Sequence, residues 1–488
     1  MIDIQTEQRH RWRAMSLLAM TQFVVILDIT IVNIALPTIK TSLGFNQADL
    51  QWVVDAYLLT FGGFLLLGGR AADLFGRRRV FMTGLALFGI ASLACGLATT
   101  SGELIAARVV QGLGGALLSP AALSLVAVIF PEGAARNKAM GIWGAVAGAG
   151  GATGVVLGGI LTNGPGWQWV FWVNVPFTLG GVLIAPLFLA KRSGAGARGQ
   201  FDLLGAITVT LGLTALIYGL VELSELGIGS GRVLIALAAA VVLLAAFGVV
   251  ETRAGHPLVP FRIFKIRSAS SANVTMLIFA AGVVAMSFFV TLYLQQVLHY
   301  SPVQAGLSFL PMACGQIIFS NVASKLIGKL GVLRLLLLGL TFSTLGFAWF
   351  SLVSANGSFL VNVLGPAVVL SAGGGFTIVG VIVAAVSGVP EQESGLAGGL
   401  INMSQQVGGA VGLAVLSAVA TWRTTAVAAG ATPNAVALTD GFRLGFAVAA
   451  VLTALAGVAA WLMLRSVFRQ PAPVVEPAVD QEAALPAS

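Results

Sequence analysis

The chain has 488 residues, of which 57% are hydrophobic and only 9% are charged, and its mean hydropathy is +0.96. Soluble globular domains carry roughly 25% charged residues, so this composition excludes a water-soluble fold. The formal net charge of +8 does not indicate a nucleic-acid partner, because the basic residues lie beside the ends of apolar blocks.

Apolar blocks of about 20 residues recur from Met15 almost to the C-terminus, each long enough for a helix to cross roughly 30 Å of hydrocarbon. Barrel strands would need only about ten alternating residues, so we predict an all-α integral membrane protein in a lipid bilayer. Fourteen spans are predicted, at 15–36, 50–69, 80–98, 103–129, 139–161, 170–190, 203–221, 233–250, 272–294, 305–327, 333–353, 359–386, 396–419 and 444–464.

The basic residues alternate from loop to loop. With the N-terminus inside, 21 of the 26 Lys and Arg residues fall on the cytoplasmic side, and Arg108 lies within a span. Only Lys40, Arg232, Arg423 and Arg443 fall outside. This bias predicts an even number of spans with both termini cytoplasmic. The basic N-terminus runs into the first span without a small-residue cleavage site, so we expect an uncleaved first helix.

The spans group as six, two and six, which suits a transporter built from two helical bundles that rock about a midplane site. We expect the chain to act as a monomer. The predicted segments are a cytoplasmic N-terminus (1–14), an N-terminal six-helix bundle (15–190), a cytoplasmic linker (191–202), two inserted helices (203–250), a second cytoplasmic linker (251–271), a C-terminal six-helix bundle (272–465) and a disordered cytoplasmic tail (466–488).

Few charged residues lie within the spans: Asp28 in the first, Asp55 in the second and Arg108 in the fourth. A charge at the centre of a span costs at least about 2.5–3.5 kcal/mol, so each needs a partner, water or a function. An Asp that faces Arg108 could bind and release a proton as its access to water changes, which makes these three residues candidates for proton coupling. The alternative is a static Asp–Arg pair that only holds helices together.

Other chemistries find little support. Cys95 and Cys314 lie within spans, and the three histidines are scattered, so neither a disulfide nor a metal site is predicted. A membrane enzyme would need clustered His, Asp or Cys. An ATP-driven pump would need Gly-Lys followed by Ser or Thr, whereas Gly328-Lys329 is followed by Leu330. We therefore predict neither an enzyme nor a cofactor.

Small and amide residues mark surfaces where helices meet. The glycines of the fifth span have small-x-x-x-small spacing, which allows static close packing or a sliding surface. Amides in the thirteenth span can line a polar cavity or bond between helices. The candidates for a substrate cavity or for gating are Asn33, Gln111, Gly154, Gly158, Gly159, Asn402, Gln405 and Gln406.

The loop after the second span reads Gly69-Arg70-Ala71-Ala72-Asp73-Leu74-Phe75-Gly76-Arg77-Arg78-Arg79. It resembles the signature of the major facilitator superfamily between spans two and three. Its two glycines allow a tight turn, and Asp73 lies among basic residues that it can bridge. In that family, the cluster resembles a cytoplasmic latch that holds the outward-facing state. The resemblance implies that the latch residues here are Gly69, Asp73, Gly76, Arg77 and Arg78.

Further runs resemble the fourteen-span drug:proton antiporters of this superfamily, the multidrug efflux type. The run 27–37, LDITIVNIALP, is similar to their first-span motif, and Arg108-Val109-Val110-Gln111-Gly112 to a fourth-span motif whose Arg is associated with proton coupling. Similar runs occur at 167–176, 293–296 and 404–409. The resemblance implies the major facilitator fold, antiport driven by the proton gradient, and a location in the cytoplasmic membrane of a bacterium.

We therefore predict a secondary antiporter that exports amphipathic drugs or toxic organic compounds while protons enter. Asp28 would carry the proton, Arg108 would modulate it, and no cofactor would be needed. The alternative on the same fold is a dedicated exporter of one endogenous metabolite, such as an antibiotic, a siderophore or a lipid. A receptor or scaffold that does not transport remains a third class.

Overall fold

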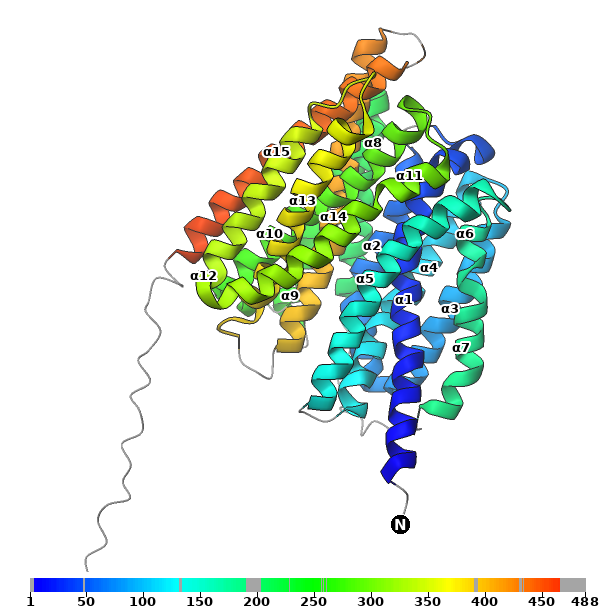
Figure 1. Ribbon diagram of the computed structural model, residues 1–488, viewed down its shortest axis with the longest axis vertical. Helices are drawn as coiled ribbons and strands as arrows, with labels where there is room; N and C mark the ends of the chain where they lie inside the picture. Colours follow the sequence, from blue (N-terminus) through cyan, green and yellow to red (C-terminus); the bar gives the residue numbers. More distant parts are fainter. Residues whose placement is uncertain are drawn as a thin grey trace, which may run out of the picture.

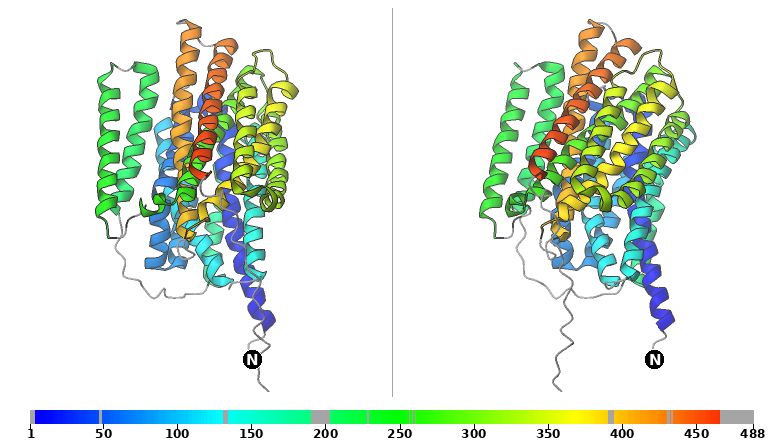
Figure 2. Two further views of the ribbon diagram at one scale, coloured as in Figure 1. Left: turned by 90° about the vertical axis from the view of Figure 1, so that its left-hand side faces the viewer. Right: turned by 60° about the vertical axis from the view of Figure 1, so that its left-hand side comes forward.

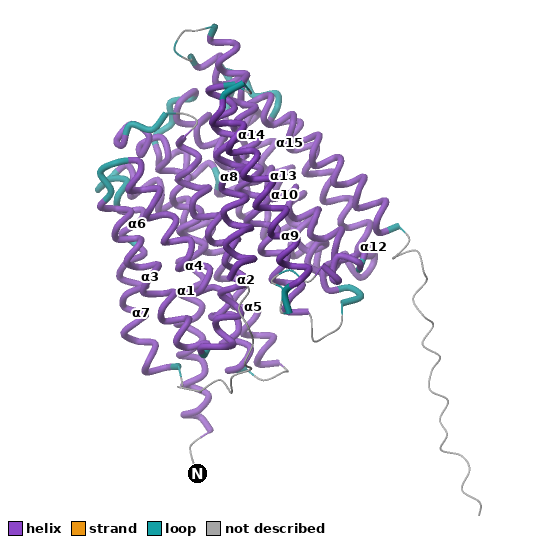
Figure 3. The backbone as a smooth tube through the Cα atoms, turned by 180° about the vertical axis from the view of Figure 1, so that it is seen from behind, coloured by secondary structure: helices purple, strands orange, loops and turns teal. Residues whose placement is uncertain are grey.

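The computed structural model describes residues 4–46, 49–130, 134–189, 203–227, 229–255, 257, 259, 261–389, 394–429, 432 and 434–465. Every regular element in these ranges is a helix, and none of them contains a strand (Figure 3). Ten stretches among these residues are long and apolar enough to cross a membrane. The prediction of an all-α membrane protein is confirmed.

The N-terminal helices form the first bundle. Helix α1 packs against α4, α5 and α7, and α4 packs against α2 and α3. The elements are α1 (Ile4–Leu43), η1 (Asp49–Gln51), α2 (Trp52–Phe75), α3 (Arg77–Leu97), α4 (Ser101–Ile129), α5 (Ala134–Asn163), α6 (Trp169–Trp172) and α7 (Asn174–Phe188).

The second bundle is built from the C-terminal helices, with α10 against α13, α14 and α15 and with α12 against α13 and α15. Its elements are η2 (Phe261–Lys265), α10 (Arg267–Leu292), η3 (Tyr293–Val297), α11 (Pro302–Ser308), α12 (Leu310–Phe350), η4 (Leu360–Leu364), α13 (Gly365–Val386), α14 (Ser394–Ala428) and α15 (Ala435–Leu464). Two further helices, α8 (Leu203–Leu226) and α9 (Gly231–Arg253), precede it in the chain.

Most of each predicted span lies on described helices. The exceptions are residue 190, which is outside the described residues, and the following residues at helix ends or junctions: Ala98, Val173, Leu189, Phe309 and 351–353. The tenth and eleventh spans share α12, which breaks at Gly331, where φ is +75°. Glycine adopts this left-handed conformation without a steric penalty, so the chain can change direction at this one residue and begin the next span. The linker 191–202 and the tail 466–488 lie outside the described residues, and the segment boundaries stay a prediction.

The long helices run between two ends of the molecule (Figure 1). We call the end at which α1 finishes the Lys40 end. The opposite end, where α2 meets α3, is the Gly76 end. Gly76 itself has φ +93° and separates the two helices.

The inserted helices stand as a pair beside the two bundles (Figure 2). Helix α8 packs against α2 of the first bundle and α14 of the second, and α9 packs on α8. Helix α8 therefore covers the line along which α2 and α14 meet. Helix α5 packs against α11 and α12, and α1 packs against α10 and α11, so these contacts join the bundles in addition to that of α2 with α14.

Candidate functional site

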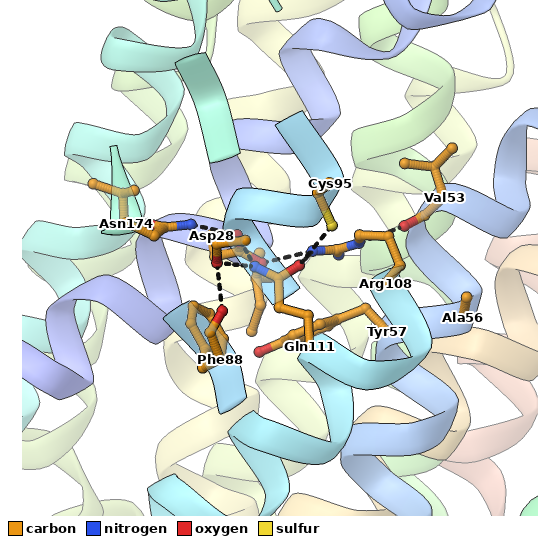
Figure 4. Close-up of polar contacts among 12 residues, drawn as sticks. Asp28, Val53, Ala56, Tyr57, Phe88, Cys95, Arg108, Gln111 and Asn174 are labelled. Atoms are coloured by element: carbon orange, nitrogen blue, oxygen red, sulfur yellow. Dashed lines mark hydrogen bonds and ion pairs between the residues drawn. The ribbon is translucent and has the colours of Figure 1, made fainter. Parts of the chain in front are cut away.

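Asp28 lies in the middle of α1 and is fully buried. Its Oδ2 accepts a hydrogen bond from Arg108 Nη1 at 2.7 Å, and the two side chains form a buried ion pair. Its Oδ1 accepts from Gln111 Nε2 at 2.8 Å and from Asn174 Nδ2 at 2.7 Å. Three donors from α4 and α7 thus surround one carboxylate on α1 (Figure 4).

Arg108 is brought to this place by the start of α4. A capping box fixes that start, with the Thr100 hydroxyl accepting from the Glu103 N–H and the Glu103 carboxylate accepting from the Thr100 N–H. The guanidinium of Arg108 lies 4.3 Å from the centre of the Tyr57 ring, and its Nε donates to the Val53 carbonyl at 2.8 Å. The cation is therefore held by α1 and by α2 together.

Gln111 connects this pair to α3. Its Oε1 accepts from Arg108 Nη1 at 2.7 Å and from the Cys95 thiol at 3.6 Å, while its Nε2 also donates to Ser92 Oγ at 2.9 Å. Gln111, Ser92 and Cys95 are each fully buried. Gln111 was predicted as a cavity or gating residue, and the structure places it inside the Asp28–Arg108 cluster.

The cluster is electrically neutral and well bonded, which is what allows two charges to remain inside an apolar bundle. Removing one partner of such a pair costs far more than removing both, because a lone buried charge is left behind.

Asp55 lies apart from this cluster. It is fully buried, and neither carboxylate oxygen has a hydrogen-bond partner among the described residues. Leu58 and Gly62 lie on the same face of α2 by helical spacing. A Cβ on Gly62 would lie 2.7 Å from Gln406 Cβ, and a Cβ on Gly409 would lie 3.5 Å from Leu58 Cδ1. Asp55 is therefore on the face of α2 that meets α14.

The glycines of α5 bring it close to α1. A Cβ at Gly154 would lie 2.9 Å from the Leu27 carbonyl oxygen, and one at Gly158 would lie 2.8 Å from that of Ile31. Both contacts are within the first bundle and flank the position of Asp28 along α1. These glycines position the helix that carries the carboxylate.

Gly159 instead faces the second bundle. A Cβ there would lie 2.7 Å from both the Pro302 carbonyl oxygen and Val303 Cα on α11. In return, a Cβ on Gly306 of α11 would lie 2.5 Å from the Val155 carbonyl oxygen. Two backbones that approach this closely hold the bundles together at the Lys40 end.

The predicted amides are separated. Asn33 is partly exposed, and its Nδ2 donates to the Ile29 carbonyl at 3.0 Å. Asn402 and Gln405 are exposed, whereas Gln406 is buried beside α2. The structure does not gather these amides into one site.

The predicted latch lies at the Gly76 end. Gly69 is on α2, where a Cβ would make ordinary contact with Pro120 at 3.7 Å, and Gly76 turns the chain toward Arg77 and Arg78 on α3. The side chain of Asp73 is outside the described part of the structure. Its pairing with the two arginines stays a prediction.

Comparison with known proteins identifies the family. The sequence profile of the Major Facilitator Superfamily matches residues 18–413. The chain belongs to the Major Facilitator Superfamily. The predicted resemblance and fold are confirmed, and this chain is a multi-pass membrane transporter of that superfamily.

Several similar facilitators carry names that refer to antibiotics. The cephamycin export protein of Amycolatopsis lactamdurans is 42% identical over 411 residues, which are 83% of this chain and 84% of the relative. The puromycin resistance protein of Streptomyces alboniger is 36% identical and covers 93% of this chain and 92% of its own. The lincomycin resistance protein of Streptomyces lincolnensis is 37% identical, with 85% of each chain covered.

Solved facilitator structures share the fold. A peptide transporter of the POT family in complex with sulfate aligns with a TM-score of 0.68 at 17% identity, over 93% of this chain and 94% of that one. A bacterial homologue of the lysosomal transporter Spinster aligns with a TM-score of 0.63 at 16% identity, over 93% and 97%.

Three members of the facilitator's buried cluster have no role in the prediction: Asn174, Ser92 and Tyr57. Asn174 carries the clearest signal, because an amide within the apolar run of α7 needs a partner in lipid. Ser92 and Tyr57 carry weaker signals, since a hydroxyl in a membrane helix usually bonds to its own backbone and a tyrosine packs like a phenylalanine. Their contacts with Gln111 and Arg108 depend on how α2, α3 and α4 pack.

Proposed function

We propose that this protein is a secondary active transporter that exports amphipathic drugs or other toxic organic compounds in exchange for protons. The similar facilitators named above are an antibiotic exporter and two antibiotic resistance proteins. The observation that carries the coupling is the buried Asp28–Arg108 pair, with 2.7 Å between the two charged groups. No cofactor is required, because the proton gradient supplies the energy.

Asp28 is the proposed proton site. In the present conformation three donors, from Arg108, Gln111 and Asn174, bind its two carboxylate oxygens. A conformational change that moves α1 away from α4, or that admits water between them, would remove those donors. Asp28 would then bind a proton, and Arg108 would regulate the exchange by moving toward or away from it.

Asp55 is the proposed second acid of the coupling machinery. Its carboxyl group is buried and has no hydrogen-bond partner among the described residues. Separation of α2 from α14 would expose it to water. Asp55 would then exchange a proton with water when these two helices are apart.

The proposed setting is the cytoplasmic membrane of a bacterium, with both termini in the cytoplasm. The loop charge bias, in which 21 of the 26 basic residues fall on one side, supports the cytoplasmic position of the termini. The Lys40 end would then be the outer end. Asp73 with Arg77 and Arg78 would hold the Gly76 end together in the alternate conformation, and we expect a monomer to suffice.

The test is a resistance and accumulation panel in an efflux-deficient bacterial host, comparing the wild type with Asp28→Asn at matched expression. Purified proteins in proteoliposomes then show whether uphill efflux needs a pH gradient. The wild type should lower accumulation of several amphipathic compounds, and Asp28→Asn should lose uphill efflux. Full proton-driven efflux by Asp28→Asn would overturn the assignment of Asp28.

A second candidate is export of a single endogenous metabolite on the same fold. It is favoured by the 42% identical relative, whose name specifies one antibiotic, cephamycin. The two candidates differ in genomic setting and in breadth. Biosynthetic genes beside this gene, with one active compound in the panel, would favour the dedicated exporter.

A further inference from the structure

A cavity of about 320 Å³ opens near the Lys40 end, away from the Asp28 cluster. Lys40 of α1 contributes from the first bundle, and η3, α10, α14 and α15 contribute from the second. We call it the Lys40 pocket and define it by Lys40, Phe289, Gln296, Ser417, Thr424 and Phe442. Its volume falls within the range of about 300–1,000 Å³ that suits small-molecule sites.

One wall of the pocket is aromatic and held in place from behind. Phe289 is buried, and its ring centre lies 5.5 Å from that of Phe442 and 5.6 Å from that of Phe446. Rings fixed in this way offer apolar contact at a low entropic cost. The apolar part of a ligand has a preformed surface here.

The other wall is polar and built with unused hydrogen-bonding capacity. Ser417 is only 5% exposed, and its hydroxyl has no hydrogen-bond partner among the described residues. Thr424 is likewise buried beside the cavity, and the Gln296 amide lines it. A buried hydroxyl without a partner costs free energy, which a ligand oxygen would recover.

One of the side chains that line the pocket is a cation. Lys40 is the only ionisable side chain among the described residues that line it. An ammonium group beside hydroxyls and an amide suits a carboxylate or another singly charged anion.

One element that lines the pocket, η3, also takes part in a contact between the bundles. Residues Tyr293–Val297 form a π-helical turn, a feature that is frequent at functional sites. On that turn Gln295 donates to the Ile34 carbonyl of α1 at 2.9 Å, while the adjacent Gln296 lines the pocket. Separation of the bundles at this end would therefore also move Lys40 relative to the aromatic wall.

We propose that the Lys40 pocket is a binding site for amphipathic organic anions, with the aromatic body against Phe289 and Phe442 and the anionic group at Lys40, Ser417 and Thr424. We infer anion binding from the side chains that line the pocket. That the pocket is the site from which exported compounds are released rests on the proposed export function. The same chemistry is found in anionic lipids, so the experiment separates a dissolved anion from a lipid.

The test is equilibrium binding of tritiated 2-naphthylacetate to the full-length protein in phosphatidylcholine nanodiscs, with empty nanodiscs as background. Lys40→Gln should weaken binding at least about tenfold, because a charge-assisted contact is lost. Lys40→Arg should retain binding, and Ser417→Ala should weaken it a few-fold. Arg232→Gln, which removes an exposed cation remote from the pocket, is the matched control and should change nothing.

Neutral 2-naphthylacetamide should bind weakly and equally to the wild type and to Lys40→Gln. Equal binding of the anion to the wild type and to correctly folded Lys40→Gln would overturn the proposal, as would binding no greater than to empty nanodiscs. Displacement of the probe by phosphatidylglycerol in the nanodisc would assign the pocket to lipid and overturn the assignment to a dissolved anion.

The variant Asp28→Asn separates this inference from the proposed function. It should lose proton-driven efflux but keep wild-type binding of 2-naphthylacetate, because Asp28 is not among the residues that line the pocket. Loss of pocket binding with intact efflux would overturn only the pocket. Intact pocket binding in a protein that shows no proton-coupled efflux would overturn only the export mechanism.

Discussion

Neutralising the buried ion pair one residue at a time should destabilise the protein more than neutralising both together. In Asp28→Asn, the new amide can keep its oxygen toward Gln111 and Asn174, but its amino group then faces Arg108 Nη1 across the space that now measures 2.7 Å. Two donors meet there, and the guanidinium is left without its anion. In Arg108→Gln, the carboxylate remains and the cation is gone.

The size of the effect follows from the burial of the pair, since Asp28 is 0% and Arg108 1% exposed. Breaking a buried pair by removing one partner costs about 3–5 kcal/mol, whereas replacing both charges is close to neutral. Each single variant should therefore lose about 3–5 kcal/mol of unfolding free energy. The double variant should lose clearly less than either, which is a coupling energy of several kcal/mol.

The assay pairs two measurements on the four proteins of this cycle: unfolding in mixed micelles with increasing SDS, and proton-driven efflux in proteoliposomes. The account predicts that the double variant recovers stability but not proton coupling. Recovery of full proton-driven efflux in the double variant would contradict it, because a static pair that only holds α1 to α4 would then explain the cluster. If the losses of the two single variants add up in the double variant, the direct contact between Asp28 and Arg108 would be refuted.

Three further substitutions test the packing around the site. Gly159→Val should push α5 from α11 and favour a conformation open at the Lys40 end, which increased spin-label distances across that end would show. The control Gly151→Val, on the same helix, should leave those distances unchanged, because the nearest contact of a Cβ at Gly151 is a side chain 4.0 Å away. Gly112→Ala places a Cβ 2.5 Å from the Tyr57 carbonyl oxygen and should lower the unfolding free energy by about 1–3 kcal/mol in SDS titration, whereas Gly102→Ala has open space and should not. Asp55→Asn should lower the unfolding free energy by less than about 1 kcal/mol in the same titration, because no hydrogen bond to a described residue is lost, and it should impair proton-driven efflux. Unaltered efflux would show that Asp55 takes no part in proton coupling.

Much of the fold can be predicted from the sequence, because lipid restricts the choices. A helix that satisfies its own backbone is the simplest structure for each apolar block, so hydrophobic length gives the spans. The predictions around 305–353 show the limit: the break between two spans is a single residue, Gly331, within one long helix. Local sequence gives the break, whereas the direction in which the chain resumes depends on packing.

The site was predictable in its charges but not in its contacts. Asp28 and Arg108 stand out because charges are rare in lipid, and they do form a pair. Gln111 is predicted as a cavity or gating residue. The sequence gives no information on which side chains its amide contacts. The separation of Asp55 from the pair depends on which face of α2 meets α14, and this is a property of the assembled bundles.

The measurement that tests the central claim most directly is proton movement caused by the transported compound. Proteoliposomes that contain a pH-sensitive dye and no initial pH gradient receive a compound that the accumulation panel identifies. The account predicts that downhill movement of the compound drives protons in the opposite direction in the wild type and not in Asp28→Asn. Movement of the compound without any proton flux in the wild type, or with protons in the same direction, would contradict it.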